Sequence, residues 1–270
     1  MPITPLPLDE LVGLRFESEG HVAVITIDNI EWKNAVSDLM HRGLRAIWEE
    51  VRDNPAYRCA VITGAGDRYF NTGAAVEAVA QAGTSDSPDD GPFSEQVRFS
   101  SRQNRVWKPV VCAVNGLVVG AGIHVVTDSD IVVASESAAF MDTHVNLGFV
   151  GAIDNIGLAR RLPIGQALRM TLQGRNYRLS ARRAYELGMV DELVAPEDLM
   201  PTAMAIAHDI AKNSPRAVRL SKEAVWNTVE MGDTQAIEYG YALERMQWSH
   251  PDFSEGPRAF AERREPIWRD

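Results

Sequence analysis

Four short runs of β-branched and other apolar residues constrain the fold of this chain most strongly. They are HVAVITID (21–28), CAVITGAG (59–66), PVVCAVNG (109–116) and DIVVAS (130–135), and each ends in turn residues. Such runs are typical of buried strands. Between the first two, residues 37–54 carry apolar side chains at helical spacing, and Ser37 is a suitable N-cap. Strands that alternate with helices predict an α/β fold in which crossover helices join parallel strands.

The second half of the chain has a helical pattern. From residue 163 onward, amphipathic stretches open at Pro or Ser and close at Gly or Pro, as in PIGQALRMTLQG (163–174) and SARRAYELG (180–188). We therefore expect a strand-rich core from about residue 15 to 162, followed by helices to residue 270. Residues 83–92, GTSDSPDDGP, lack apolar anchors and predict either a solvated surface loop or a lid near an active site.

The charge and cysteine content argue against several classes of protein. The 270 residues include 27 basic and 37 acidic side chains, a net charge of −10, which disfavours a nucleic-acid or anionic-membrane partner. Cys59 and Cys112 lie in apolar runs, so we expect buried, reduced thiols and neither a disulfide framework nor a metal site. We also expect no membrane span, no targeting segment and a cytoplasmic location.

Two glycine-containing turns in the first half follow predicted strands. One lies in FNTGAAVEA (70–78) and the other in VVGAGIHVV (118–126). Where a strand passes through small residues into a helix, backbone N–H groups at the helix start stay free, and a substrate oxygen can approach them closely. Two such turns side by side would direct two N–H groups at one oxygen and form an oxyanion hole. Each turn alone is also compatible with a simple packing role.

Two isolated histidines follow in the same strand-rich region. His124 lies between Ile123 and Val125, and His144 lies in FMDTHVNLG (140–148). A lone histidine in an apolar run is commonly a hydrogen-bonded core residue. The alternative is that the two rings are proton-transfer groups that face one substrate.

Five segments occur in an order that is typical of one known family. They are EWKNAVS (31–37), FNTGAAV (70–76), KPVVCAVNGLVVGAGIHVVTDSDIVVASESAAF (108–140), MTLQGRNYRLSARRAYELGMVDELV (170–194) and FSEGPRAFAERREPIW (253–268). Over about residues 12–268, without large gaps, the chain resembles the crotonase superfamily, also called the enoyl-CoA hydratase/isomerase family. Because several independent segments occur in the right order, the chain is identified as a member of this superfamily.

The resemblance implies an α/β fold with a crotonase-type spiral of ββα units and a helical C-terminal trimerisation region. It divides the chain into an N-terminal extension (1–14), the spiral core (15–195) and the C-terminal helical region (196–270). It also implies an oxyanion hole for the carbonyl of an acyl-CoA thioester, with donors at Ala74 and Ala121, in the two turns described above. The implied partners are a small-molecule substrate and further copies of the chain, as a homotrimer or a dimer of trimers. No cofactor is expected apart from CoA as part of the substrate.

The chain departs from the hydratases of this family where protons are transferred. Those enzymes carry one glutamate soon after the second glycine turn and another further along, and here the two positions hold His124 and His144, which become candidate catalytic residues. Ala75 replaces the usual acid of the first turn. His124 would lie in the first turn of a helix, where the helix dipole favours a neutral imidazole. We expect Asp154 to orient one ring, and prefer it to Asp142, whose side chain would point away from His144 in an extended segment.

One branch of the superfamily, the β-diketone hydrolases typified by oxocamphor hydrolase, resembles this pattern. Its members have two active-site histidines, an aspartate after the second one and a glutamate on a late helix, which falls near Glu244 here. This resemblance implies an alternative activity, the retro-Claisen hydrolysis of a carbon–carbon bond in a cyclic β-diketone. Glu244 is also compatible with a solvated helix charge or an ion pair between subunits.

The tail of the chain favours a CoA substrate instead. RAFAERREPIW (258–268) resembles the segment with which CoA-using members contact the nucleotide, which implies that Arg263 or Arg264 binds a phosphate. EWKNA, which includes Lys33 and Ala35, resembles the loop that holds the adenine end. We therefore expect an enzyme that acts on an acyl-CoA thioester. The alternatives are the diketone hydrolase and a non-catalytic acyl-CoA-binding protein that lost the two glutamates.

Overall fold

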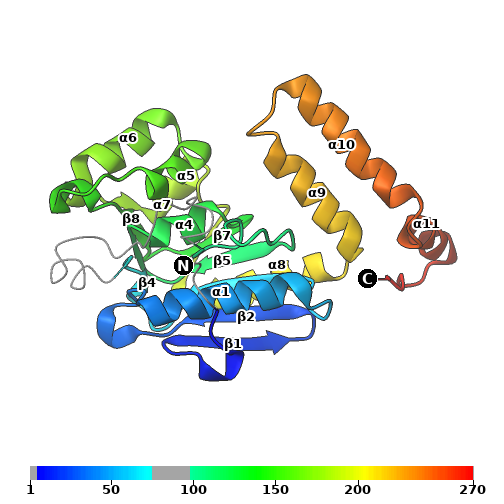
Figure 1. Ribbon diagram of the computed structural model, residues 1–270, viewed down its shortest axis with the longest axis horizontal. Coiled ribbons are helices and arrows are strands. Elements are labelled where there is room, and N and C mark those ends of the chain that lie inside the picture. Colours follow the sequence, from blue (N-terminus) through cyan, green and yellow to red (C-terminus); the bar gives the residue numbers. More distant parts are fainter. Residues whose placement is uncertain (1–4, 75–97, 270) are drawn as a thin grey trace.

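The computed structural model describes residues 5–74 and 98–269. The loop or lid expected at residues 83–92, the helix expected after the first glycine turn and Ala75 lie outside the described residues. Within them the chain forms two β-sheets with helices packed around them, and a group of late helices extends to one side (Figure 1).

The larger sheet has the strand order β1-β2-β3-β5-β7-β10. Its strands are β1 (Leu14–Glu19), β2 (Val22–Ile27), β3 (Cys59–Gly64), β5 (Val110–Val114), β7 (Ile131–Ser135) and β10 (Glu192–Val194). β1 pairs antiparallel with β2, and the later pairs are parallel. The four strands predicted from the apolar runs are therefore confirmed, and so is their parallel pairing. β3 and β5 are buried along their whole length, which explains their uninterrupted apolar sequences.

The residue pattern did not predict the second sheet, which has the order β4-β6-β8-β9. Its strands are β4 (Tyr69–Asn71), β6 (Leu117–Val119), β8 (Ala139–Met141) and β9 (Leu179–Ser180). Strands of two or three residues are too short to show a period-two pattern. Each of β3, β5 and β7 is followed by a short strand of this second sheet, so the two glycine turns follow β4 and β6 and not the long strands themselves.

The expectation that only helices follow residue 162 is wrong. β9 completes the smaller sheet and β10 completes the larger one, at residues 179–180 and 192–194. The two helices predicted here are confirmed, one before β9 and one between β9 and β10. α6 (Ile164–Gln173) ends before Gly174, and α7 (Ala181–Glu186) follows its N-cap Ser180, whose side chain accepts a hydrogen bond from the Arg183 N–H.

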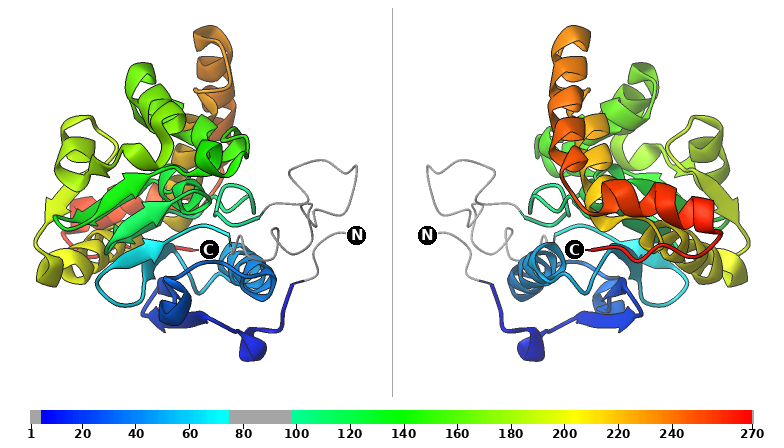
Figure 2. Two further views of the ribbon diagram at one scale, coloured as in Figure 1. Left: turned by 90° about the vertical axis from the view of Figure 1, so that its left-hand side faces the viewer. Right: turned by 90° about the vertical axis from the view of Figure 1, so that its right-hand side faces the viewer.

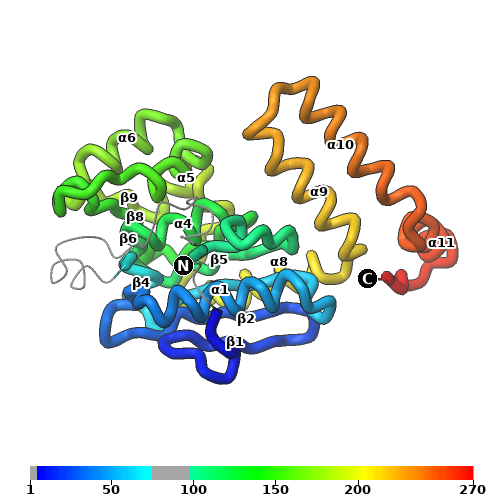
Figure 3. The backbone as a smooth tube through the Cα atoms, viewed as in Figure 1, coloured from blue at the N-terminus to red at the C-terminus, as the bar shows by residue number. Residues whose placement is uncertain are grey.

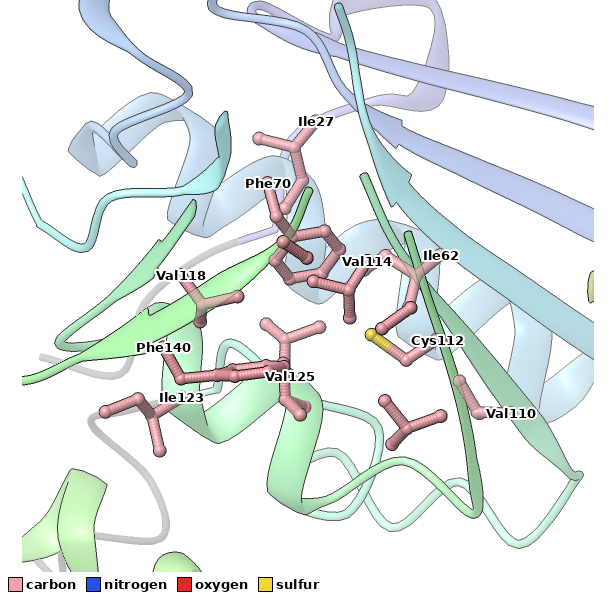
Figure 4. Packing of buried hydrophobic residues seen from close by; sticks show 14 of the residues in the cluster. Ile27, Ile62, Phe70, Val110, Cys112, Val114, Val118, Ile123, Val125 and Phe140 are labelled. Atoms are coloured by element: carbon pink, nitrogen blue, oxygen red, sulfur yellow. The ribbon is translucent and has the colours of Figure 1, made fainter. Parts of the chain in front are cut away.

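The main hydrophobic core lies between the two sheets and includes residues of α1 (Asp38–Asp53) and α4 (Gly122–Thr127). Figure 4 shows Ile62 and Cys112 of the larger sheet facing Phe70, Val118 and Phe140 of the short strands. This packing holds the ends of β4 and β6, and hence the two glycine turns, against α4.

Two predictions about single residues are confirmed in this part of the fold. Ser37 caps α1, because its hydroxyl oxygen accepts a hydrogen bond from the Met40 N–H at 3.3 Å. Cys59 and Cys112 are free and buried, and burial raises the pKa of each thiol to about 12, so both stay protonated.

The opposite face of the larger sheet is covered by α8 (Leu199–Ala211). Small side chains of this helix pack against strand residues in a second apolar cluster, which includes Ala203, Ala207, Val61, Val111 and Val133. By its packing α8 belongs to the core, although it lies beyond residue 195. The division of the chain at residue 195 stays a prediction.

The last three helices form an arm: α9 (Pro215–Asn227), α10 (Asp233–Trp248) and α11 (Asp252–Glu262). Figures 1 and 3 show α10 and α11 standing away from the sheets, with α6 at the other end of the molecule. The end of α5 (Ile153–Arg161) contacts α9, because the Arg161 guanidinium lies 5.5 Å from the centre of the Trp226 ring. Figure 2 shows from the side that α10 rises above the sheets and that α11 leads back toward them. In the described part of the chain, no helix is both long and apolar enough to cross a membrane.

Candidate active site

The two glycine turns lie side by side. Gly73, after β4, and Gly120, after β6, have φ angles of 90° and 52°, which glycine adopts without strain. A Cβ atom on Gly73 would lie 3.1 Å from the carbonyl oxygen of Val119 and 3.3 Å from the backbone nitrogen of Ala121. The lack of a side chain at residue 73 therefore lets the two turns approach each other.

Each turn contains a backbone N–H group without an acceptor among the described residues. The Val36 N–H donates to the Gly73 carbonyl at 2.8 Å, which holds the first turn against the segment before α1. Within the described residues, the N–H groups of Ala74 and Ala121 donate to no acceptor. Ala121 is the N-cap residue of α4, where a helix leaves N–H groups unpaired. The two predicted donors thus lie in neighbouring turns, and their role as an oxyanion hole stays a prediction.

Three side chains from three different helices meet beside these turns. His124 lies in the first turn of α4, His144 begins the 3₁₀ helix η3 (His144–Leu147), and Asp154 lies in the first turn of α5. Asp154 Oδ1 is 3.1 Å from His124 Nε2, and Asp154 Oδ2 is 3.2 Å from His144 Nε2. A Cβ atom on Gly120 would lie 3.5 Å from His144 Cε1, so this ring also borders the second turn. The fold therefore brings together the two histidines and the preferred aspartate.

Asp142 contacts His144, contrary to our expectation. Its Oδ1 is 2.5 Å from His144 Nδ1, and its Oδ2 accepts a hydrogen bond from Asn155 Nδ2 at 3.0 Å. We expected Asp142 and His144 on opposite sides of an extended segment. The backbone leaves that conformation at Thr143, whose ψ is 0°, and η3 begins at the next residue. His144 consequently lies between two carboxylates.

The contacts within this cluster determine its charges. The hydrogen bond to Asp142 raises the pKa of His144, and the negative charge of Asp154 adds to this effect against the opposing effect of burial. Burial acts to raise the pKa of Asp142, but hydrogen bonds from His144 and Asn155 outweigh it and lower that pKa. Burial is likewise outweighed at Asp154, where the hydrogen bond from His124 and the charge of His144 lower the pKa. Asp142, His144 and Asp154 all favour their charged forms.

Sequence reasoning missed three neighbours of the two histidines. Asp142 was placed on the wrong side, and no local pattern pointed to Asn155 or to Gln103, whose Nε2 is 3.4 Å from His124 Nδ1. The spacing of Asp142, two residues before His144, becomes informative only when the turn at Thr143 is known. Gln103 comes from a segment that only the tertiary fold brings beside α4.

The predicted CoA-binding residues lie in two separate parts of the chain. Lys33 is exposed and Ala35 is half-buried, and their segment borders the first glycine turn because Thr72 Oγ1 donates to the Lys33 carbonyl at 3.0 Å. Arg263 and Arg264 follow α11 at the opposite end of the molecule (Figure 1). A single chain therefore does not bring the two predicted CoA-binding segments together.

The arm also carries the other predicted residue that lies far from the histidines. Glu244 is exposed on α10, away from α4 and α5 (Figure 1). Arg264 already has partners within the arm, since its guanidinium is 2.6 Å from a carboxylate oxygen of Glu255 and equally close to one of Glu262. Arg263 is exposed.

Known proteins share this arrangement of elements over nearly the whole chain. The family described as enoyl-CoA hydratase/isomerase matches residues 17–270. The chain belongs to the enoyl-CoA hydratase/isomerase family. Membership of the crotonase superfamily, predicted from five sequence segments, is therefore confirmed.

Individual members of the enoyl-CoA hydratase/isomerase family resemble the chain along their full length. The (E)-benzylidenesuccinyl-CoA hydratase of Thauera aromatica is 30% identical over 261 residues, which cover 94% of this chain and 97% of that protein. The carnitinyl-CoA dehydratase of Proteus mirabilis is 31% identical over 267 residues, which cover 95% and 98%. The crystal structure of an enoyl-CoA hydratase/isomerase from Mycobacterium paratuberculosis has a TM-score of 0.86 at 36% identity, covering 96% of this chain and 99% of that one. The predicted crotonase-type fold is thereby confirmed.

Proposed function

We propose that this chain is an enzyme that adds water to an unsaturated acyl-CoA thioester or removes water from a hydroxyacyl-CoA thioester. The observation that carries this proposal is the His124–Asp154–His144 cluster, which borders two glycine turns whose N–H groups at Ala74 and Ala121 have no acceptor in the described part of the chain. The names of two similar proteins, a hydratase of (E)-benzylidenesuccinyl-CoA and a carnitinyl-CoA dehydratase, support the same class of reaction.

In this proposal the backbone binds the thioester and the side chains move the protons. The N–H groups of Ala74 and Ala121 form the oxyanion hole and stabilise the negative charge that develops on the thioester oxygen as water adds to the β-carbon. His124 and His144 act as the acid–base pair, so that one group takes a proton from water and another delivers a proton to the α-carbon. Asp154 orients both rings through their Nε2 atoms.

We propose that CoA is held by residues of two subunits. Lys33 and Ala35 lie next to the first glycine turn and contact the adenine end, whereas Arg263 belongs to the arm and binds a phosphate. Arg264 is the weaker candidate because Glu255 already occupies its guanidinium. Since a single chain keeps the arm away from the histidines, the arm of one copy would serve the site of another.

Exposed apolar side chains of the arm support a homotrimer or a dimer of trimers. They are Val225, Val229, Ile237, Tyr241, Met246, Phe253 and Phe260. A soluble protein rarely leaves this much apolar surface uncovered, so a second copy of the chain is the expected cover. Light scattering after size-exclusion chromatography should give three or six times the mass of one chain, and a monomer would contradict this part of the proposal.

A second candidate function is the retro-Claisen hydrolysis of a cyclic β-diketone. It is favoured by the aspartate after the second histidine, which contacts both rings. In this reaction a histidine activates water, water attacks one carbonyl carbon, and the bond between the two carbonyl groups breaks with release of an enolate. Glu244 would take part only if a neighbouring copy brought it to the site, since it is exposed on α10.

Mass spectrometry of products from a small substrate panel tests these functions. The panel contains crotonyl-CoA, β-ketoacyl-CoA thioesters and bicyclic diketones. Hydration yields a water adduct that keeps its CoA, whereas carbon–carbon hydrolysis yields a ring-opened keto acid from a diketone or two fragments from a β-ketoacyl-CoA. CoA thioesters that bind without turnover would indicate the non-catalytic alternative and contradict both activities. The His144→Ala variant is the control for background reaction.

A further inference from the structure

The hydrogen-bond acceptors around His144 determine its protonation state. Nδ1 faces Asp142 Oδ1 at 2.5 Å, and Nε2 faces Asp154 Oδ2 at 3.2 Å. An ionised carboxylate only accepts hydrogen bonds, so a ring nitrogen that faces one must carry a hydrogen. Two carboxylates, one on each nitrogen, therefore call for a doubly protonated imidazolium at His144.

Asp142 is fixed in place as an anion. Asp142 is 0% exposed, and its Oδ2 accepts a hydrogen bond from Asn155 Nδ2. The same nitrogen of Asn155 also donates to the carbonyl of Gly151 at 3.1 Å. A Cβ atom on Gly151 would lie 2.9 Å from Asp142 Oδ2, so only glycine leaves room for this packing. The pKa of Asp142 is lowered, because the hydrogen bonds from His144 and Asn155 outweigh the effect of burial.

His124 has the opposite pattern of partners. Gln103 Oε1 accepts hydrogen bonds from the N–H groups of Phe99 at 2.8 Å and Ser100 at 3.0 Å, which orients the amide. The NH₂ group of Gln103 consequently points toward His124 Nδ1, at 3.4 Å. A nitrogen that faces a donor must accept, so His124 is neutral and carries its single hydrogen on Nε2, toward Asp154.

We propose that Asp142 is a positioning residue that holds His144 as an imidazolium, while Gln103 holds His124 as a neutral ring, so that the two histidines have fixed and different tasks. The catalytic part of this inference rests on the proposed function. Among the described residues, the titratable groups that face His144 are Asp142, from the segment after β8, and Asp154, from α5; His124, from α4, faces it across Asp154.

The proton balance of hydration follows from these assignments, and it revises the pair proposed above: Asp154 takes the role of base in place of His124, and His144 remains the acid. Asp154 takes a proton from water as the oxygen bonds to the β-carbon and the electron pair of the double bond moves to the thioester oxygen. His144 then gives its Nε2 proton to the α-carbon, which restores the carbonyl. The proton on Asp154 returns to His144 Nε2, 3.2 Å away, and the site regains its starting state. His124 keeps its Nε2 hydrogen throughout and holds Asp154 in place.

Nuclear magnetic resonance of the ligand-free protein tests the protonation states without any substrate. Long-range ¹H–¹⁵N spectra at neutral pH should show two protonated nitrogens in His144 and only Nε2 protonated in His124. A neutral His144 at neutral pH would overturn the proposal. Because no turnover is required, an inactive protein with the expected spectrum would contradict the proposed function alone.

The Asp142→Asn variant tests the positioning role. We expect the pKa of His144 to fall, because the variant lacks the carboxylate that faces Nδ1, and the alkaline limb of the kcat/KM profile to move to lower pH with KM little changed. A purely structural role would lower activity equally at all pH values and leave the limb in place, which would overturn the proposal.

Two further variants keep the test decisive. Asn155→Ala removes one donor to Asp142 and should shift the limb in the same direction by a smaller amount, even if Asp142→Asn folds poorly. Asp128→Asn is the matched control, because Asp128 is a buried carboxylate that accepts from Ser100 Oγ at 2.6 Å and has no side-chain contact with either histidine. A shift of the His144 pKa in this control as large as in Asp142→Asn would count against a specific role for Asp142.

Discussion

Helix α4 and the arm of α9 to α11 distribute their polar and apolar residues in opposite ways. Every residue of α4 is buried, and His124 is the ring among them that can ionise. In the arm, the buried residues include Lys222, Asp252 and Glu255, while large apolar side chains such as Phe260 are exposed. Helix α4, in the core, thus covers its apolar residues within one chain, whereas the arm leaves apolar surface that another molecule would cover.

The arm is joined to the core by a polar anchor. Lys222 Nζ on α9 is 2.8 Å from Asp130 Oδ2 and donates to the carbonyl groups of Val106 and Lys108. Trp226 Nε1, one turn later, donates to Asp130 Oδ1 at 2.6 Å. Directional contacts of this kind fix the position of α9 against the core and bury little apolar area. The arm therefore has a defined position, but its apolar side chains stay exposed.

The largest expected effect is on kcat, and it distinguishes a catalytic residue of the core from a CoA-binding residue of the arm. His144→Ala should lower kcat by about 10²–10⁴, because it removes an acid–base group. Arg263→Ala should instead raise KM for CoA thioesters and leave kcat nearly unchanged, since it removes a phosphate contact. Steady-state kinetics with one substrate of the panel measure both. A loss of kcat in Arg263→Ala that matches His144→Ala would remove the distinction between the two regions.

The next largest effect is the loss of stability when an apolar side chain is truncated in the core or in the arm. Phe140→Ala should lower the free energy of unfolding by about 3–5 kcal/mol, because the ring is 1% exposed in the main core. Phe260 is 87% exposed in a single chain, so Phe260→Ala should lower stability only at protein concentrations at which the chain self-associates. Urea unfolding at several protein concentrations checks this. An equal loss at high dilution would mean that the arm already packs within one chain.

A smaller effect concerns the pH dependence of stability in the site region. The raised pKa of His144 adds stability that is complete below about pH 6.5 and disappears as the pH rises through the raised value. The lowered pKa of Asp142 adds stability that is present above about pH 3.9 and disappears as the pH falls through the lowered value. Between these limits Asp142→Asn should cost about 1.5–3 kcal/mol, the range for a hydrogen bond between charged groups.

The free energy of unfolding, measured at several pH values, tests this pH dependence, and variants of the arm serve as the reference. Variants of the exposed arm, such as Phe260→Ala, should keep the pH profile of the parent protein, because their contacts involve no group of the histidine cluster. If the stability of Asp142→Asn ran parallel to that of the parent protein at every pH, Asp142 and His144 would not stabilise the protein through their charges.

The smallest effect is the loss of stability when the N-cap serine of α1 or of α9 is replaced. Ser37→Ala should cost about 0.5–2 kcal/mol, because Ser37 accepts from the Met40 N–H at the start of α1. Ser214 caps α9 and also donates to the buried Asp252 at 2.5 Å, so Ser214→Ala should cost more. Thermal unfolding of both variants measures the difference. An equal or smaller loss at Ser214 would show that the link between α9 and α11 contributes little to holding the arm.

The sequence by itself determined the elements that depend on neighbouring residues. Apolar runs marked β2, β3, β5 and β7, and local signals placed the caps at Ser37 and Ser180, because strand burial and helix capping act over a few residues. Together with the family resemblance, the sequence also singled out His124, His144 and Asp154, which the fold brings within hydrogen-bonding distance.

Only the tertiary structure decided how those residues are paired. The smaller sheet consists of strands too short to show a period, and it is this sheet that places the glycine turns side by side. Asp142 reaches His144 because one backbone angle at Thr143 ends the extended run, and Gln103 reaches His124 from a distant segment. Such contacts depend on the path of the chain in space, which residue order and periodicity do not encode locally.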